Sequence, residues 1–197
     1  MRRILLNYPK FGNDIDEVDQ IAADLVDKFC EYIDDFNTQN NILIVPDLIG
    51  WKFLEESYGI SATFDGRKYA DPIAEHYCAT PGRALNGPTA IINSIGKAKL
   101  YKACGVAAVH ISLPRKLADT KEESLQVLRV LVEAAKEKGL LMLNIAIYDV
   151  EKLRQAQLDP EHNEDVIVRV WGYSAKFVDL CKEMQEHVIS RVLTLGE

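Results

Sequence analysis

The 197-residue sequence predicts an α/β domain in which neighbouring parallel strands are joined by helices. The second half of the chain alternates apolar, strand-like runs with segments of helical periodicity. The run 140–147 is almost continuously apolar, as expected for a strand that is covered on both faces. Hydrophobic residues make up 48% of the chain and charged residues 27%, so the chain can form a core.

The first half predicts one long helix, one strand and a long irregular stretch. The helix is expected at about 14–36, where acidic residues occupy the first turn and the remaining acidic side chains form a solvated face. A strand is expected at Ile42–Val45, before Pro46. Turn-forming residues crowd 59–90, which is typical of a functional loop. The helical periodicity is carried by Ile15, Val18, Ile21, Ala22, Leu25, Phe29 and Tyr32.

The second half predicts the alternating helices and strands of the α/β class. Thr120 and Glu123 have the spacing of a capping box, and the helix that they open ends at Gly139. Its buried face is expected to comprise Leu125, Leu128, Leu131, Val132 and Ala135. The other expected elements are helices at 89–104, 149–157 and 178–193, and strands at 106–113, 140–147 and 166–171.

Charge and composition exclude several classes of partner. The net charge of -7 and the pI near 5.2 argue against a nucleic acid or an anionic membrane surface. No apolar run approaches the roughly 18 residues that a membrane span needs. The basic and then apolar start, Met1–Leu6, is too short for a signal peptide, so a cytoplasmic location is expected.

The cysteines and histidines show no metal-binding spacing. No CxxC or HExxH pattern occurs, so no metal site is expected, and the thiols are expected to be reduced and mostly buried. These residues are Cys30, Cys78, Cys104, Cys181, His76, His110, His162 and His187.

The strand near 166–171 stops at Gly172, between Trp171 and Tyr173. Considered alone, this glycine is typical of a turn, because glycine adopts positive φ at little cost. Its surroundings are Arg169-Val170-Trp171-Gly172-Tyr173-Ser174 and a closing helix, Met184–Arg191. This pattern resembles the carboxy-terminal radical domain of the glycyl radical enzymes, the family of pyruvate formate-lyase, the glycerol and hydroxyproline dehydratases and choline trimethylamine-lyase.

Other stretches resemble the same family in the same order, from about residue 7 to residue 191. At Thr63–Lys68, Phe64 stands where the family has proline. The matching stretches are Lys10–Asp14 with Val18 and Asp19, Thr63–Lys68, Asn86–Ala90 with Asn93, Ser94 and Lys97, Asn144, and Gln155–Gln157.

The resemblance implies a fold and a chemistry. The fold is part of the family's barrel, with a half-barrel portion at 1–160 and a glycyl radical domain at 161–197 in one domain. A radical S-adenosylmethionine activase, which carries the iron–sulfur cluster, would remove a hydrogen atom from Gly172, and no cofactor would be bound tightly. The radical loop would be buried, with Arg169, Val170 and Ser174 around it and Trp171 and Tyr173 excluding water and oxygen.

The family passes its radical to a cysteine that in several branches lies in a Cys-x-Glu loop upstream of the glycine, and no Cys-x-Glu occurs upstream of Gly172 in this chain. The one Cys-x-Glu of the sequence, Cys181-Lys182-Glu183, lies after that glycine, in the helix expected at 178–193. Cys78 is the nearest substitute, although an ordinary loop thiol explains it more simply. Family members are several times longer, and Met1 falls where they are about three-quarters complete. The resemblance therefore implies a small subunit, inactive alone, whose large partner subunit carries the thiyl cysteine.

Two other functions remain open: a spare part that repairs an oxygen-damaged enzyme, and a non-catalytic regulatory relative. The family implies lyase or dehydratase chemistry on a small molecule under anaerobic conditions, and the sequence does not identify the substrate. Candidates for a substrate-cavity wall are Asp65, Gly66, Arg67 and Asn144, each of which is also compatible with a purely structural role.

Overall fold

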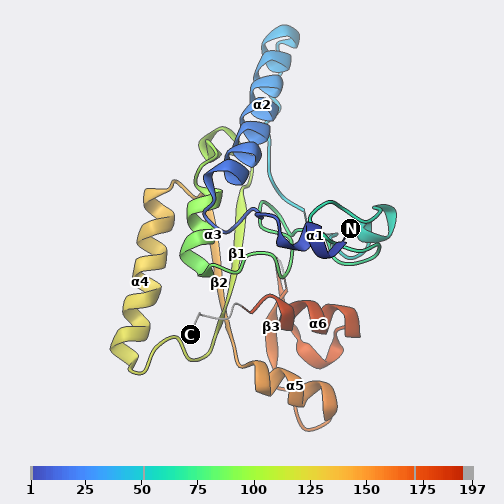
Figure 1. The fold of residues 1–197 in the computed structure, drawn as a ribbon. Coiled ribbons are helices and arrows are strands. Elements are labelled where there is room, and N and C mark those ends of the chain that lie inside the picture. Colours follow the sequence, from blue (N-terminus) through green and yellow to red (C-terminus); the bar gives the residue numbers. More distant parts are fainter. Residues whose placement is uncertain (1, 51, 171, 193–197) are drawn as a thin grey trace.

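The computed structural model describes residues 2–50, 52–170 and 172–192 and confirms the α/β class. Its centre is a parallel pair of strands, β1 (Ala108–Pro114) and β2 (Met142–Tyr148). Figure 1 shows two helices on one side of this pair, and a smaller group of elements near its lower end. The two helices are α3 (Gly87–Ile95) and α4 (Lys121–Glu137), and the smaller group comprises α5 (Val150–Leu158), β3 (Ile167–Arg169), β4 (Ser174–Lys176) and α6 (Lys182–Ser190).

The remaining described elements lie mainly in the first third of the chain. They are α1 (Arg2–Asn7), α2 (Asp16–Asn40) and short 3-10 helices at Glu56–Gly59, Leu100–Lys102 and Phe177–Asp179. No helix in the described part of the chain is both long enough and apolar enough to cross a membrane.

Local sequence signals set the helix starts in the second half. The Thr120 hydroxyl accepts from the backbone N–H of Glu123, and the Glu123 carboxylate accepts from the backbone N–H of Thr120, which confirms the capping box. At the start of α5, the side chain of Asp149 accepts from the backbone N–H of Lys152 at 3.1 Å. These caps fix where the chain leaves β1 and β2 to form the flanking helices.

Buried apolar side chains form two clusters. In the first, Val109, Ile111 and Leu113 of β1 pack with α2, α3 and α4. In the second, Ala146 and Tyr148 of β2 pack with α5, β3 and α6. Alternation along β1 therefore turns His110 and Ser112 away from the first cluster, toward the side where the second group of elements lies.

Three sequence predictions about the apolar segments are wrong. Ile42–Val45 forms no strand; its side chains are exposed, and the nearest pairing is an isolated bridge between Leu48 and Ala107. β2 is not covered on both faces, because Met142 and Ile147 are about half exposed. On α4, only Leu131 and Ala135 of the expected face are fully buried, while Leu125 and Val132 are exposed.

The largest difference concerns α2. The residues that α2 buries are Asp19, Ala23, Val26 and Cys30, whereas most of the apolar residues that predicted the helix face outward. Asp19, expected on a solvated face, is inaccessible to solvent; its carboxylate accepts from Ser94 Oγ at 2.9 Å and Lys97 Nζ at 2.8 Å. Of the cysteines expected to be mostly buried, Cys104 and Cys181 are exposed.

Candidate functional site

Gly172 lies in the tight connection between the antiparallel strands β3 and β4. The backbone N–H of Val170 donates to the carbonyl of Tyr173 at 3.0 Å and closes this hairpin. Val170 is fully buried, but Gly172 and Tyr173 are exposed. The described residues of this chain therefore do not provide the burial expected for the radical loop; Trp171 lies outside the described residues.

The backbone of Arg169, at the end of β3, is held by two side chains from elsewhere in the chain. The Tyr148 hydroxyl donates to the Arg169 carbonyl at 3.0 Å and accepts from the Arg169 N–H at 2.9 Å. Nη2 of Arg191 donates to the same carbonyl at 3.0 Å. The side chain of Arg169 itself reaches Ser174 Oγ at 3.4 Å across the hairpin.

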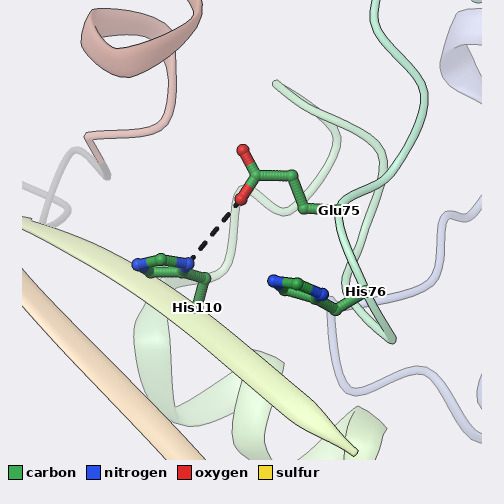
Figure 2. A group of neighbouring side chains, drawn as sticks. All are labelled: Glu75, His76 and His110. Carbon is green, nitrogen blue, oxygen red and sulfur yellow. Dashed lines mark ion pairs between the residues drawn. The ribbon is translucent and has the colours of Figure 1, made fainter. Parts of the chain in front are cut away.

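A buried carboxylate, Glu75, organises the cluster beside this hairpin. Nη1 of Arg191 donates to its two oxygens at 2.9 and 3.1 Å, and Nε2 of His187 is hydrogen-bonded to it. Nδ1 of His110, on β1, lies 3.7 Å from the carboxylate (Figure 2). A cavity of about 290 Å³ adjoins the cluster and is also lined by Cys78.

Burial and charge together set the ionisation of this cluster. Burial would raise the pKa of Glu75, but the hydrogen bond from His187 and the charge of Arg191 outweigh it and lower the pKa to about 2. Burial, together with the charge of Arg191, lowers the pKa of His110 to about 4. Burial raises the pKa of the Cys78 thiol to about 12. At neutral pH the cluster therefore pairs an ionised Glu75 with Arg191, beside a neutral His110 and a protonated thiol.

The cluster also contains a group with the composition of a metal site. Glu75, His76 and His110 each place one ligand-type atom within 4.8 Å of the others (Figure 2). However, Arg191 already balances the charge of the carboxylate. Nδ1 of His76 accepts the backbone N–H of Gly50 at 3.3 Å, which places the ring hydrogen of the neutral imidazole on Nε2 and leaves no free lone pair. The arrangement favours a hydrogen-bonded cluster over a metal centre.

The residues predicted for a cavity wall lie apart from this cavity. The guanidinium of Arg67 is buried and donates to the carbonyls of Ile60, Ser61, Lys68 and Asp71, so it ties its own loop together. Gly66 has φ +91°, a conformation that favours glycine, and a Cβ there would lie 2.6 Å from the terminal methyl of Leu6, which would have to move.

The carboxylate of Asp65, in the same loop, accepts from the hydroxyl of Thr63 and from the backbone N–H of Arg67 at 3.3 Å. Asn144 lies on β2 opposite His110 and does not line the cavity. A role for Asp65, Gly66, Arg67 and Asn144 in a substrate cavity remains a prediction.

Sequence reasoning did not identify the cluster of Glu75, His110, His187 and Arg191 as a site. Glu75 and Arg191 are separated by 116 positions, so no local spacing connects them. The sequence offered two separate signals: the acid–histidine pair at 75 and 76 within the expected functional loop, and the closing helix Met184–Arg191, which contains His187 and Arg191.

Gly172, in the connection between β3 and β4, lies in the Arg-Val-x-Gly-Tyr pattern that resembles the glycyl radical enzymes. The chain belongs to this family: the model described as "Glycine radical" matches residues 73–178, more than half of the chain. A second model, "Pyruvate formate lyase-like", matches residues 1–52.

Individual relatives agree with the family match. Isethionate sulfite-lyase of Nitratidesulfovibrio vulgaris is 32% identical over 97% of this chain. The glycerol-bound B12-independent glycerol dehydratase of Clostridium butyricum superposes over 99% of this chain with a TM-score of 0.88 and 30% identity. Hydroxyproline dehydratase of Clostridioides difficile, solved with trans-4-hydroxy-L-proline, gives a TM-score of 0.83 over 98% of this chain at 25% identity.

The chain spans only about a quarter of these relatives, namely 23% of the isethionate lyase, 25% of the glycerol dehydratase and 24% of the hydroxyproline dehydratase. The match lies in their C-terminal portion, and the fold is accordingly a partial glycyl radical enzyme barrel with its radical domain.

The ionisation of the cluster predicts a loss of stability in acid. The pKa of Glu75 is lowered from 4.5 to about 2. Its contribution to the free energy of unfolding is therefore complete above pH 4.5 and is lost as the pH falls toward 2. The contribution of neutral His110 to the free energy of unfolding is complete above pH 6.5 and is lost as the pH falls toward 4. For Glu75 the free energy of unfolding should fall by an amount on the order of 3 kcal/mol.

The measurement is the urea midpoint between pH 7 and pH 3. Glu75→Gln should lower the midpoint at pH 7 and flatten its decline below pH 4.5, because no carboxylate remains to be protonated. The control is Glu186→Gln, which removes an exposed carboxylate paired with Arg154. If the urea midpoint of Glu75→Gln declined with falling pH as steeply as that of the wild-type chain, this carboxylate would not govern acid stability.

Proposed function

We propose that this chain carries the radical of a glycyl radical lyase or dehydratase on Gly172, and that a separate, larger polypeptide supplies the thiyl cysteine. The observation that carries the proposal is the setting of Gly172. A Cβ added there would meet no described atom within 4 Å, whereas at Gly66 it would overlap a leucine. Packing among the described residues gives no reason for glycine at 172, and radical chemistry does.

The chemical reason is the geometry of an α-carbon radical. When the activase removes one hydrogen atom from Cα of Gly172, the carbon becomes planar, and its unpaired electron spreads over the adjoining amide and carbonyl groups. A side chain at that carbon would clash with the flanking peptide groups as the centre flattened. Glycine avoids this clash, and the open hairpin leaves Cα accessible to an activating enzyme.

The cysteines of the chain support a thiyl donor on another polypeptide. Cys30 is buried in the helical core, Cys104 is exposed with no glutamate near it in the sequence, and Cys181 is exposed at the N-cap of α6. Cys78 lines the cavity, where its sulfur accepts the backbone N–H of His110 at 3.4 Å and burial keeps it protonated. Only Cys181 has the Cys-x-Glu spacing, with Glu183, and it lies after Gly172 at the start of α6 rather than in a loop upstream of the glycine.

The exposed apolar surface supports the same conclusion. Beyond its contact with α3, helix α2 projects away from the rest of the molecule (Figure 1). The outward face of α2 carries an apolar stripe, defined here as Ile21, Leu25, Phe29, Tyr32 and Phe36. A continuous exposed stripe of this length is typical of an interface. The proposed partner would cover this stripe and the hairpin that carries Gly172.

The experiment that tests the proposal is anaerobic electron paramagnetic resonance of the purified chain. The chain is incubated with its activase, S-adenosylmethionine and a one-electron reductant, with and without the cysteine-bearing polypeptide. The expected result is a doublet from the single α-hydrogen left on Gly172, and product formation only when the partner is present. No signal under any combination would instead favour a regulatory relative.

A truncated Clostridium butyricum glycerol dehydratase that ends before the matched quarter tests the spare-part alternative. Because the chain superposes on this enzyme over 99% of its length, it could in principle replace that quarter. Restored turnover of glycerol by the mixture would identify a repair protein. Turnover only with a dedicated partner would support the two-component enzyme.

A further inference from the structure

We infer that Tyr148 and Arg191 are positioning residues that hold the Gly172 loop in register for hydrogen-atom transfer, with Glu75 fixing Arg191. The inference rests on the proposed radical at Gly172. It follows from the way in which the backbone of Arg169, three positions before that glycine, is bound.

Tyr148 forms with β3 the pair of backbone hydrogen bonds that a neighbouring strand would otherwise form. Strand β3 is only three residues long, and its described pairing is with β4. One hydroxyl, at the end of β2, both accepts from the N–H and donates to the carbonyl of Arg169. Tyr148 is 7% exposed and packs in the second core cluster, so this hydroxyl is a fixed reference point on the central strand pair.

Arg191 provides the second attachment. Its Nη2 donates to the Arg169 carbonyl, while its Nη1 donates to both oxygens of Glu75. A planar guanidinium presents donors in a rigid fork and can bridge two acceptors, which a lysine ammonium on a flexible stem does poorly. The side chain of Glu75 is 4% exposed, so the carboxylate that orients Arg191 is itself held in place.

These attachments matter because Gly172 has little direct packing of its own. No described atom lies within 4 Å of the point where a Cβ at Gly172 would be. The position of its Cα is set through the hairpin closure between Val170 and Tyr173 and through Arg169. Hydrogen-atom transfer requires close contact between the reacting atoms, and a displacement of about 1 Å costs about a hundredfold in rate. Loss of either attachment should therefore reduce turnover without changing the affinity for substrate.

Two conservative substitutions test the inference. Tyr148→Phe keeps the buried ring and removes both hydrogen bonds to Arg169. Arg191→Lys keeps a positive charge beside Glu75 and removes the second donor to Arg169. The matched control is Arg154→Lys, which makes the same kind of substitution in an exposed pair with Glu186 that joins α5 to α6.

The first measurement is amide hydrogen exchange on the purified, unactivated chain. Exchange at Arg169 and Val170 should quicken by roughly tenfold in Tyr148→Phe, the effect of about one lost hydrogen bond. The second measurement is the electron paramagnetic resonance spectrum of the activated chain. Its line shape should differ from that of the wild-type chain in both variants, because the Gly172 loop is displaced. The third is turnover of the assembled enzyme, where kcat per radical should fall at least tenfold while KM stays constant.

The outcomes separate this inference from the proposed function. No doublet in the wild-type chain would defeat the radical assignment, while the exchange experiment would still report whether Arg169 is held. A wild-type doublet accompanied by unchanged line shape and unchanged kcat per radical in both variants would overturn the positioning role. Equal effects in Arg154→Lys would also overturn it, because that control leaves Arg169 untouched.

Discussion

Gly172→Ala is expected to fold like the wild-type chain, to give no glycyl radical signal and to support no turnover with the partner present. Folding should survive because an added Cβ meets no described atom within 4 Å. The radical should be lost because an alanine side chain opposes the planar α-carbon and blocks close approach by the activase. The measurements are the thermal unfolding midpoint, the anaerobic resonance spectrum and product formation.

Gly59→Ala is the matched control, since a Cβ at Gly59 also meets none of the described atoms within 4 Å. This variant should keep both the signal and the activity. Exposure to oxygen adds an independent measurement, because oxygen cleaves the backbone at a glycyl radical. After treatment with the activase, the wild-type and Gly59→Ala chains should break near position 172. The Gly172→Ala chain should stay intact. Turnover by the alanine variant would remove Gly172 from its assigned role.

Local signals in the sequence predicted the parts of the fold that depend on neighbouring residues. The capping box at Thr120 lies at the start of α4, where side chain and backbone are three residues apart, and the helix expected at 149–157 is α5. The run around 140–147 predicted β2, and its neighbour β1 is parallel as expected. The glycine within its aromatic and basic surroundings also stood out locally, because the whole pattern fits within six residues.

Features that depend on distant parts of the chain were not predictable in the same way. Periodicity shows that α2 has an apolar face but cannot show that this chain leaves the face uncovered. It also could not show that Asp19 would be buried, since the groups that satisfy it, Ser94 and Lys97, lie more than 70 positions away. Glu75 is a similar case, because its partners, His187 in α6 and Arg191 directly after that helix, lie 112 and 116 positions away.

Leu25→Glu is expected to leave the chain folded and to weaken assembly with the cysteine-bearing polypeptide by roughly a hundredfold. Leu25 is 70% exposed and lies at the centre of the apolar stripe of α2. With 3.6 residues per turn, the other members of the stripe fall within about 40° of it on the helix surface. Desolvating a glutamate at the centre of an interface is costly, while in the free chain the same glutamate stays in water.

The control places the same charge on the other side of α2. Gln20 is exposed and lies about 140° around the helix from Leu25, so Gln20→Glu should leave assembly unchanged. Two measurements apply: binding of a hydrophobic dye by the free chain, which should fall in Leu25→Glu, and the dissociation constant with the partner. Because the stripe is exposed here and the relatives are about four times longer, a covering polypeptide is the simplest account of it. A wild-type chain that bound neither dye nor partner would contradict that account even if Gly172 carried a radical.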